Sequence, residues 1–159
     1  MSCAVKTTPV TYLATIGEMV PGRVYVAGPM TNYPEFNFPA FDSLAAYMRR
    51  NGWQVINPAE RDRQMYDDTA PGFAEGDVQL WSEAAGFDLH KAMRFDLGTI
   101  TTAQAIVLLP GWAKSSGAQK EKAVAEAVGA EILYAFPVRN GDWFVSDVDI
   151  DAQVPEVVG

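Results

Sequence analysis

The stretch "AIVLLPGWAKSSGAQKEKAVAEAVGA", residues 105–130, decides the fold class. It begins as a short apolar run and passes through Ser115, Ser116 and Gly117 into a segment with helical spacing. A strand that enters a helix through small residues is typical of α/β proteins, which place anion-binding and catalytic groups at that junction. Glu121 lies near the start of the predicted helix and is therefore able to face a ligand bound there.

Strand and helix patterns alternate on both sides of this stretch. Gly28 and Pro29 stop the apolar run 24–27, and Pro39 sits where a first-turn proline belongs, with Asn37 as a plausible helix cap. The predicted elements are, in chain order, strand 24–27, helix 39–51, strand 53–58, helix 89–100, strand 104–109, helix 116–128, strand 131–136 and edge strand 143–146. We expect a flavodoxin- or Rossmann-like α/β fold: an open, mainly parallel sheet of about five strands with flanking helices. Asn140-Gly141 predicts a hairpin that adds a C-terminal antiparallel edge strand.

The length of 159 residues suits one α/β domain. Its predicted core covers about 24–146. The segment 59–87 mixes charges, Pro-Gly and scattered aromatic residues, and we interpret it as a long loop or flap. The segment 147–159 reads as an acidic tail.

Composition limits the partners and the compartment. A net charge of −8 opposes binding to polymeric nucleic acid, because such binding depends on Lys and Arg displacing counterions. Cys3 is the single cysteine, so no intramolecular disulfide can form, which favours a reducing compartment. The apolar runs are too short for a bilayer and the N-terminus lacks signal-peptide features, so the expected location is the cytoplasm, away from membranes.

Standard cofactor and metal motifs are missing from the sequence. It contains no G-x-x-x-x-G-K-[ST], G-x-G-x-x-G, H-E-x-x-H or C-x-x-C motif. One cysteine and one histidine cannot form a cysteine–histidine zinc cluster. We therefore expect neither a metal nor an organic cofactor.

Carboxylates remain as the candidate chemical groups. If the sheet is parallel, the strand ends at 25–30, Asn57 and 110–117 share one edge, and Asp96 and Glu121 can converge there on a small ligand. A glutamate in a first helical turn is favoured by the helix dipole and stays ionised, which suits a nucleophile. A carboxylate pair of this kind fits cleavage of N-glycosidic bonds, whose transition state resembles an oxocarbenium ion.

Structural readings of the same residues compete with this hypothesis. Glu121 lies in Lys-Glu-Lys, a pattern typical of a solvated helix face, and Asp96 alone resembles a surface or capping residue. Ser115 fits an N-cap, Tyr25 fits core packing, and Trp112 fits a loop cover.

Several motifs together resemble the nucleoside 2-deoxyribosyltransferase superfamily. This superfamily includes the deoxynucleoside 5′-monophosphate N-glycosidases and small, often phage-encoded, relatives. The matching motifs are "VYVAGPM", "NFPAF" followed by "GWQVINPAE", "RFDLGTI" and "AIVLLPGWAKSSGAQKE", which together cover about residues 24–135.

This resemblance implies roles for individual residues. Glu121 would be the nucleophile at the anomeric carbon, Asp96 would bind the substrate and protonate the base, and Tyr25 would orient Glu121. Ser115, Ser116 and Gly117 match the loop that binds the 5′ side of the sugar. The other candidate substrate-binding residues are Gly28, Pro29, Met30, Asn57 and Trp112. The resemblance also implies a homodimer or a higher homo-oligomer.

The expected function is hydrolysis of the base–sugar bond of a nucleoside or its 5′-monophosphate through a covalent glycosyl-glutamate intermediate. Base exchange, as in a deoxyribosyltransferase, is an alternative, because a second base could intercept the intermediate. Another alternative is a non-catalytic protein that binds a nucleotide or signal molecule on the same fold. The sequence leaves open the base, ribose or deoxyribose, and nucleoside or nucleotide.

Overall fold

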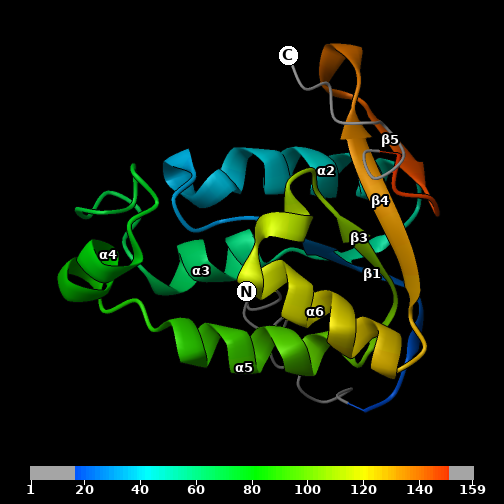
Figure 1. Ribbon diagram of the computed structural model, residues 1–159, viewed down its shortest axis with the longest axis horizontal. Helices are drawn as coiled ribbons and strands as arrows, with labels where there is room; N and C mark the ends of the chain where they lie inside the picture. Colours follow the sequence, from blue (N-terminus) through cyan, green and yellow to red (C-terminus); the bar gives the residue numbers. More distant parts are fainter. Residues whose placement is uncertain (1–16, 151–159) are drawn as a thin grey trace, which may run out of the picture.

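A five-stranded sheet forms the centre of the molecule, with helices on both faces (Figure 1). The computed structural model describes residues 17–150. The strands are β1 (Val20–Ala27), β2 (Gln54–Ile56), β3 (Ala103–Leu108), β4 (Glu131–Pro137) and β5 (Trp143–Ser146). Their order is β2-β1-β3-β4-β5; the first four run parallel, and β5 runs antiparallel to β4. The predicted fold class is confirmed.

The interior strand β1 is buried on both faces of the sheet. Its residues alternate between the faces with the two-residue period of a strand. Val24 and Val26 join the core under α2 (Phe38–Arg50). Tyr25 and Ala27 join the opposite core with residues of α5 (Leu89–Ile100) and α6 (Ser116–Ala127). A strand buried on both faces reads as a continuous apolar run, which is how "VYVA" reads in the sequence.

Helix α2 begins as the sequence indicates, with Asn37 at the predicted N-cap position but without a capping hydrogen bond from its side chain. Pro39 lies in the first turn. Asn37 stands before the helix in the left-handed conformation, with φ 62°, and its side chain caps no helical N–H. Instead, its Nδ2 donates to the carbonyl oxygen of Pro29, 3.0 Å away. Asn37 thus ties the start of α2 to the loop after β1.

Helix α5 has the predicted bounds, and its buried face includes polar residues. Leu89 is 45 % exposed, whereas Asp96 is only 8 % exposed. The buried residues are Ala92, Asp96, Thr99 and Ile100. Because residues four and seven apart share one side of a helix, Asp96 faces inward together with Ala92 and Thr99.

The predicted long loop 59–87 contains two helices, α3 (Pro58–Met65) and α4 (Val78–Ala85). Residues 66–87 pack against 32–38, and we call these two segments together the aromatic cap. Its rings are Phe36, Phe38, Tyr66, Phe73, Trp81 and Phe87. The two segments also share backbone hydrogen bonds, such as the one from Asn32 N to the carbonyl oxygen of Gly76, 2.8 Å away. A Cβ at Gly76 would lie 2.1 Å from the carbonyl oxygen of Tyr33, so this approach requires glycine.

The hairpin between β4 and β5 confirms the predicted turn at Asn140-Gly141. A short 3₁₀ turn, η4 (Arg139–Gly141), joins the strands, and Asn140 and Gly141 both have positive φ. Cys3 and residues 151–159 of the predicted tail lie outside the described residues. Within 17–150, no helix has the length and apolar content needed to cross a membrane.

Candidate active site

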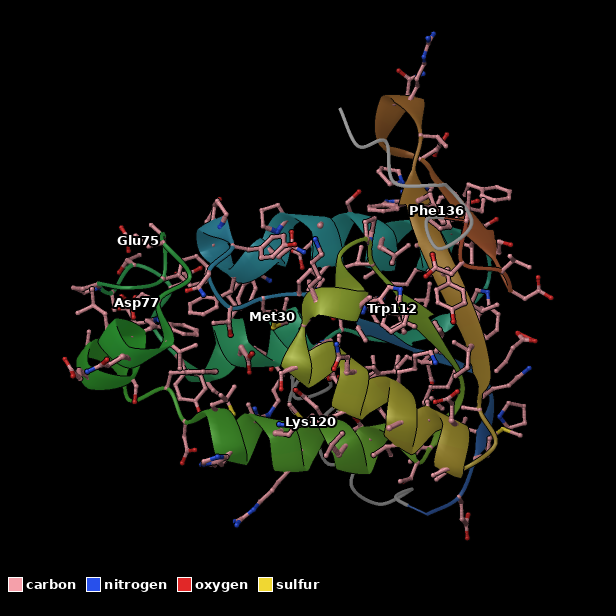
Figure 2. All side chains as sticks on the ribbon, viewed as in Figure 1. Met30, Glu75, Asp77, Trp112, Lys120 and Phe136 are labelled. Carbon is pink, nitrogen blue, oxygen red and sulfur yellow. The ribbon has the colours of Figure 1, made fainter. Side chains whose placement is uncertain are left out.

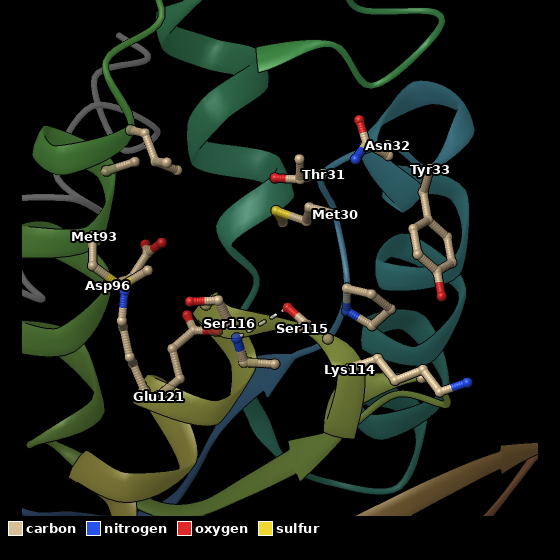
Figure 3. Close-up of a pocket in the computed structure, with 18 of the residues that line it drawn as sticks. Met30, Thr31, Asn32, Tyr33, Met93, Asp96, Lys114, Ser115, Ser116 and Glu121 are labelled. Carbon is tan, nitrogen blue, oxygen red and sulfur yellow. Dashed lines mark hydrogen bonds between the residues drawn. The ribbon is translucent and has the colours of Figure 1, made fainter. Parts of the chain in front are cut away.

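A pocket of about 400 Å³ opens at the carboxyl ends of the parallel strands (Figure 3). Its walls come from the loops after β1 and β3, the start of α6, α5 with Phe87 just before it, and α3. A volume of this size suits a small ligand. The predicted position at the strand-end edge of the sheet therefore holds a real cavity.

Glu121 faces the pocket and is not on a solvated helix face. It is only 7 % exposed, and the hydroxyl of Tyr25 donates a hydrogen bond to its Oε2. The buried residues of α6 are Ala118, Glu121 and Ala125, which lie on one side of the helix. Glu121 follows the first turn of α6, so the helix dipole acts on it less strongly than the sequence suggested.

Asp96 enters the same pocket from α5. It is 8 % exposed, and its Oδ1 is the buried side-chain polar atom that lacks a hydrogen-bond partner within residues 17–150. Figure 3 shows the Asp96 and Glu121 side chains on facing helices, both directed into one space. An unpartnered buried carboxyl oxygen is costly in free energy and points to a ligand that completes it.

Asp96 and Glu121 differ in the causes that shift their pKa values. Burial raises the pKa of Asp96, and the neighbouring charge of Glu121 raises it further. Burial also raises the pKa of Glu121, to about 8, although the hydrogen bond from Tyr25 opposes that rise, so the expectation that helix position alone keeps Glu121 ionised is wrong. Tyr25 and Arg61 also lower the pKa of Asp96, but the Tyr25 hydroxyl donates to Glu121 and Asp96 Oδ1 has no partner among the described residues. When the pair holds one proton, Asp96 is therefore the favoured carrier and Glu121 the favoured anion.

Tyr25 acts on the site from behind and does not line the pocket. It is fully buried in the core under α5 and α6. Burial raises its pKa well above the usual value, and the charges of Asp96 and Glu121 add to that rise. Tyr25 is thus a neutral hydroxyl that donates to Glu121 at ordinary pH.

The start of α6 forms the other end of the pocket. Ser115 is the N-cap, since its Oγ accepts from Ala118 N at 3.2 Å. Ser116 and Gly117 also line the pocket, as predicted. Lys114 and Lys120 line it too. Free N–H groups at a helix start, hydroxyls and two cations suit an anionic group.

The loop after β1 provides three predicted lining residues: Gly28, Pro29 and Met30. Gly28 packs so closely on the residue after β3 that an added Cβ would lie 2.7 Å from Leu109 Cβ. A larger residue there would force the loop after β1 and Leu109 apart. Glycine at position 28 therefore allows the two strand ends to lie close together.

Two predicted binding residues do not reach the pocket. Asn57 caps α3 by accepting from Ala59 N at 3.0 Å, and its Nδ2 donates to Asp42. Trp112 turns toward β4, where its ring lies 5.8 Å from that of Tyr134 (Figure 2). A position at the strand-end edge does not fix the direction of a side chain, and these two side chains have structural partners instead.

Sequence reasoning missed the wall made by α3 and the aromatic cap. Asp62, on α3, is 3 % exposed and lines the pocket, as does Phe87. A signal was present: Asn57-Pro58 marks a helix start, and Asp62 follows Pro58 and Ala59 at the spacing of one helix face. Further unpredicted lining residues are Thr31, Asn32, Tyr33, Leu89, Ala92, Met93, Gly111, Lys114, Ala118 and Lys120.

No group of three or more His, Cys, Asp or Glu side chains within 17–150 has an arrangement that could hold a metal ion. The pocket brings together two buried carboxyls and one fixed hydroxyl. Such a set can perform nucleophilic attack and proton donation within one cavity.

Comparison with known proteins yields one match. A family model described as "Domain of unknown function (DUF4406)" matches residues 22–134. This range runs from β1 into β4 and includes every residue of the pocket described above. Searches of curated proteins and of solved structures found no match.

Proposed function

The chain belongs to the DUF4406 family, and we propose that it is an N-glycosidase that cleaves the base–sugar bond of a nucleoside or its 5′-monophosphate. The observation that carries this proposal is the pair of buried carboxyls in one pocket: Glu121, held by Tyr25, and Asp96, with an unpartnered oxygen. The resemblance of the sequence motifs to nucleoside 2-deoxyribosyltransferases adds support.

The shape of the pocket suggests how such a substrate would lie. A sugar whose anomeric carbon faces Glu121 would point its 5′ side toward Ser115, Ser116 and Lys114. A 5′-phosphate there would meet the start of α6 and positive charge. The base would then extend toward the apolar side, where Met93 and Phe87 lie. This orientation favours a monophosphate over a nucleoside.

In the first step, a carboxylate oxygen of Glu121 attacks the anomeric carbon. The bond from that carbon to the base breaks, and its electron pair leaves with the base. Asp96 transfers its proton to the departing base, which leaves as a neutral molecule. Tyr25 fixes the attacking carboxylate and has no part in the proton transfer.

In the second step, Asp96 is a carboxylate and takes a proton from water. The water oxygen attacks the anomeric carbon, the ester bond to Glu121 breaks, and the free sugar leaves. A second base in place of water would instead give a deoxyribosyltransferase. The two outcomes differ in how fully the occupied pocket excludes water.

Incubation of the purified protein with deoxynucleoside and ribonucleoside monophosphates, followed by chromatography of the products, tests the proposal. We expect free base and sugar phosphate. Rapid acid quenching followed by mass measurement should show a sugar adduct on the protein that is absent in Glu121→Gln. Addition of a second free base distinguishes the alternatives, since a transferase forms a new nucleotide and a hydrolase does not.

Binding without turnover would contradict the proposal. If the unaltered protein binds nucleotides, releases no base and forms no adduct, the pocket belongs to a non-catalytic binding protein. If turnover persists undiminished in Glu121→Gln, the covalent mechanism is wrong even if base is released.

A further inference from the structure

Asp62 is a buried acid that the proposed reaction does not use. Its carboxyl lines the pocket at 3 % exposure, from α3. Arg61 Nη1 lies 3.3 Å from Asp62 Oδ1, and the Arg61 guanidinium stacks 4.5 Å from the ring centre of Phe95 on α5. Burial of an ionised carboxyl costs free energy unless a cation or a hydrogen-bond donor contacts it. Arg61 contacts only Oδ1 of Asp62 directly.

Asp62 stands where the pocket becomes apolar. It also lines a smaller hollow of about 30 Å³ that shares Met30, Thr31, Phe87 and Leu89 with the main pocket. The remaining walls of the hollow are Phe36, Phe38, Val78 and Trp81. Asp62 is therefore the one charged residue among the described residues that line this hollow.

A flat apolar ring in this part of the pocket would lie next to Met30, Phe87 and Leu89, with one carboxyl at its edge. Nucleobases have this combination of apolar faces and a polar edge. The anionic end of the pocket, at Ser115 and Lys114, is formed by other elements. In the orientation proposed above, the base is thus the part of the substrate that meets Asp62.

We infer that Asp62 binds the edge of the base and makes the site selective for bases that carry an exocyclic amino group, such as cytosine and adenine, over their oxo counterparts, uracil and hypoxanthine. This inference rests on the proposed function. A carboxylate only accepts hydrogen bonds, so it pairs with an amino N–H and opposes a carbonyl oxygen. If Asp62 faces the exocyclic position, an oxo base places two buried acceptors against each other there, although its ring N–H remains a donor at the neighbouring position.

The charge state of Asp62 agrees with this role. Burial raises its pKa to about 6, and Arg61 opposes the rise. Asp62 is therefore mostly ionised at pH 7 and available as an acceptor. Asp96, by contrast, keeps its proton more readily, because it lacks a directly paired cation and faces Glu121.

The test compares deoxycytidine with deoxyuridine monophosphate, and deoxyadenosine with deoxyinosine monophosphate. We expect kcat/KM of the unaltered protein to favour the amino member of each pair by about tenfold or more. Asp62→Asn should reduce or reverse this preference, because an amide also offers an N–H donor. Glu60→Gln is the matched control: it lies on the same helix, pairs with Arg49 at the surface, and should leave the preference unchanged.

Binding measurements separate this inference from the proposed function. Calorimetric titration of Glu121→Gln with the same nucleotides reports selectivity without turnover. If this variant binds the amino members more tightly and the added Asp62→Asn removes the difference, the inference stands even if no base is ever released. If the unaltered protein releases both bases of a pair with equal kcat/KM, the inference is overturned and the proposed function remains. If no nucleotide binds or reacts, both are overturned.

Discussion

The pocket has two acidic walls, and the buried carboxyls of the two walls have different kinds of partner. On the α3 wall, Asp62 has a cation beside it, because Arg61 pairs with it and is itself held against Phe95. On the α5–α6 wall, Asp96 and Glu121 have no ion pair among residues 17–150, and the hydroxyl of Tyr25 is the neutral donor to Glu121.

This difference in partners suits the carboxyls of the two walls to different roles. A carboxyl beside a cation keeps a fixed charge and suits recognition of a polar edge. Two neighbouring carboxyls without a directly paired cation titrate together, so that one of them readily keeps a proton, which suits proton transfer and attack. In the proposed function, the α5–α6 wall is thus the reactive wall and the α3 wall the binding wall. Substitutions on the reactive wall should have the larger effects on turnover.

The largest effect is expected for Glu121→Gln. The amide keeps the size of the side chain and can still accept from Tyr25, but it cannot attack the anomeric carbon. We expect kcat/KM for base release to fall at least about 10³-fold. Glu126→Gln is the control, because it makes the same change on an exposed site of the same helix, where Glu126 pairs with Lys122. Equal activity of the two variants would remove Glu121 from the reaction.

Asp96→Asn should reduce turnover of natural nucleotides by about 10²- to 10⁴-fold, since the amide cannot deliver a proton to the base. The loss should be much smaller for a substrate analogue whose leaving group is stable as an anion, because that group needs no proton. Parallel kinetics with both substrates measure this difference. A purely structural role of Asp96 would reduce both rates by the same factor.

Tyr25→Phe should have a moderate effect, about tenfold in kcat/KM near neutral pH. Its hydroxyl favours the ionised form of Glu121, so its removal raises the pKa of Glu121. The ascending limb of the pH–rate profile should therefore move to higher pH, and the activity should recover there. Tyr134→Phe, whose ring packs against Trp112 outside the pocket, should leave the profile in place. An unshifted profile in Tyr25→Phe would show that the hydroxyl does not tune Glu121.

The reactive wall was largely predictable from the sequence, whereas the binding wall was not. Glu121 follows a strand and a loop of small residues within one continuous stretch, and Asp96 lies on the preceding helix. Local periodicity and the rule for parallel sheets therefore suffice to bring both to one edge. Neither rule gives the direction of a side chain, which is why Asn57 and Trp112 were placed in the pocket wrongly.

Asp62 reaches the pocket through packing between distant segments. Its helix is short, and the segment after it is held by contacts with residues 32–38 that leave no periodic pattern. Phe36 has a positive φ and is almost fully buried among aromatic rings, which no local propensity indicates. The composition of 59–87 does not indicate a packed structure, because the residues that stabilise this segment lie at 32–38.

The smallest effects are expected on stability. The two walls should differ in the pH range over which the free energy of unfolding falls. Burial raises the pKa of Asp96 and Glu121 well above about 4, and that of Asp62 to about 6. Between its unfolded and folded pKa, each acid keeps its proton in the folded state and releases it in the unfolded state. The free energy of unfolding therefore falls as pH rises, through about pH 4–6 for Asp62 and to higher pH for the pair.

Amide variants do not titrate, so they isolate these contributions. At pH 8, Glu121→Gln and Asp96→Asn should melt a few degrees above the unaltered protein, on the scale of about 2–4 °C per kcal/mol. Below about pH 4 the advantage should vanish, because these acids are then mostly protonated in both the folded and the unfolded state. Melting curves across this range, with Glu126→Gln as the exposed control, measure the difference. A constant difference in melting temperature between variant and unaltered protein from pH 4 to 8 would mean that folding does not raise the pKa values of Asp96 and Glu121. The division between the two walls would then fail.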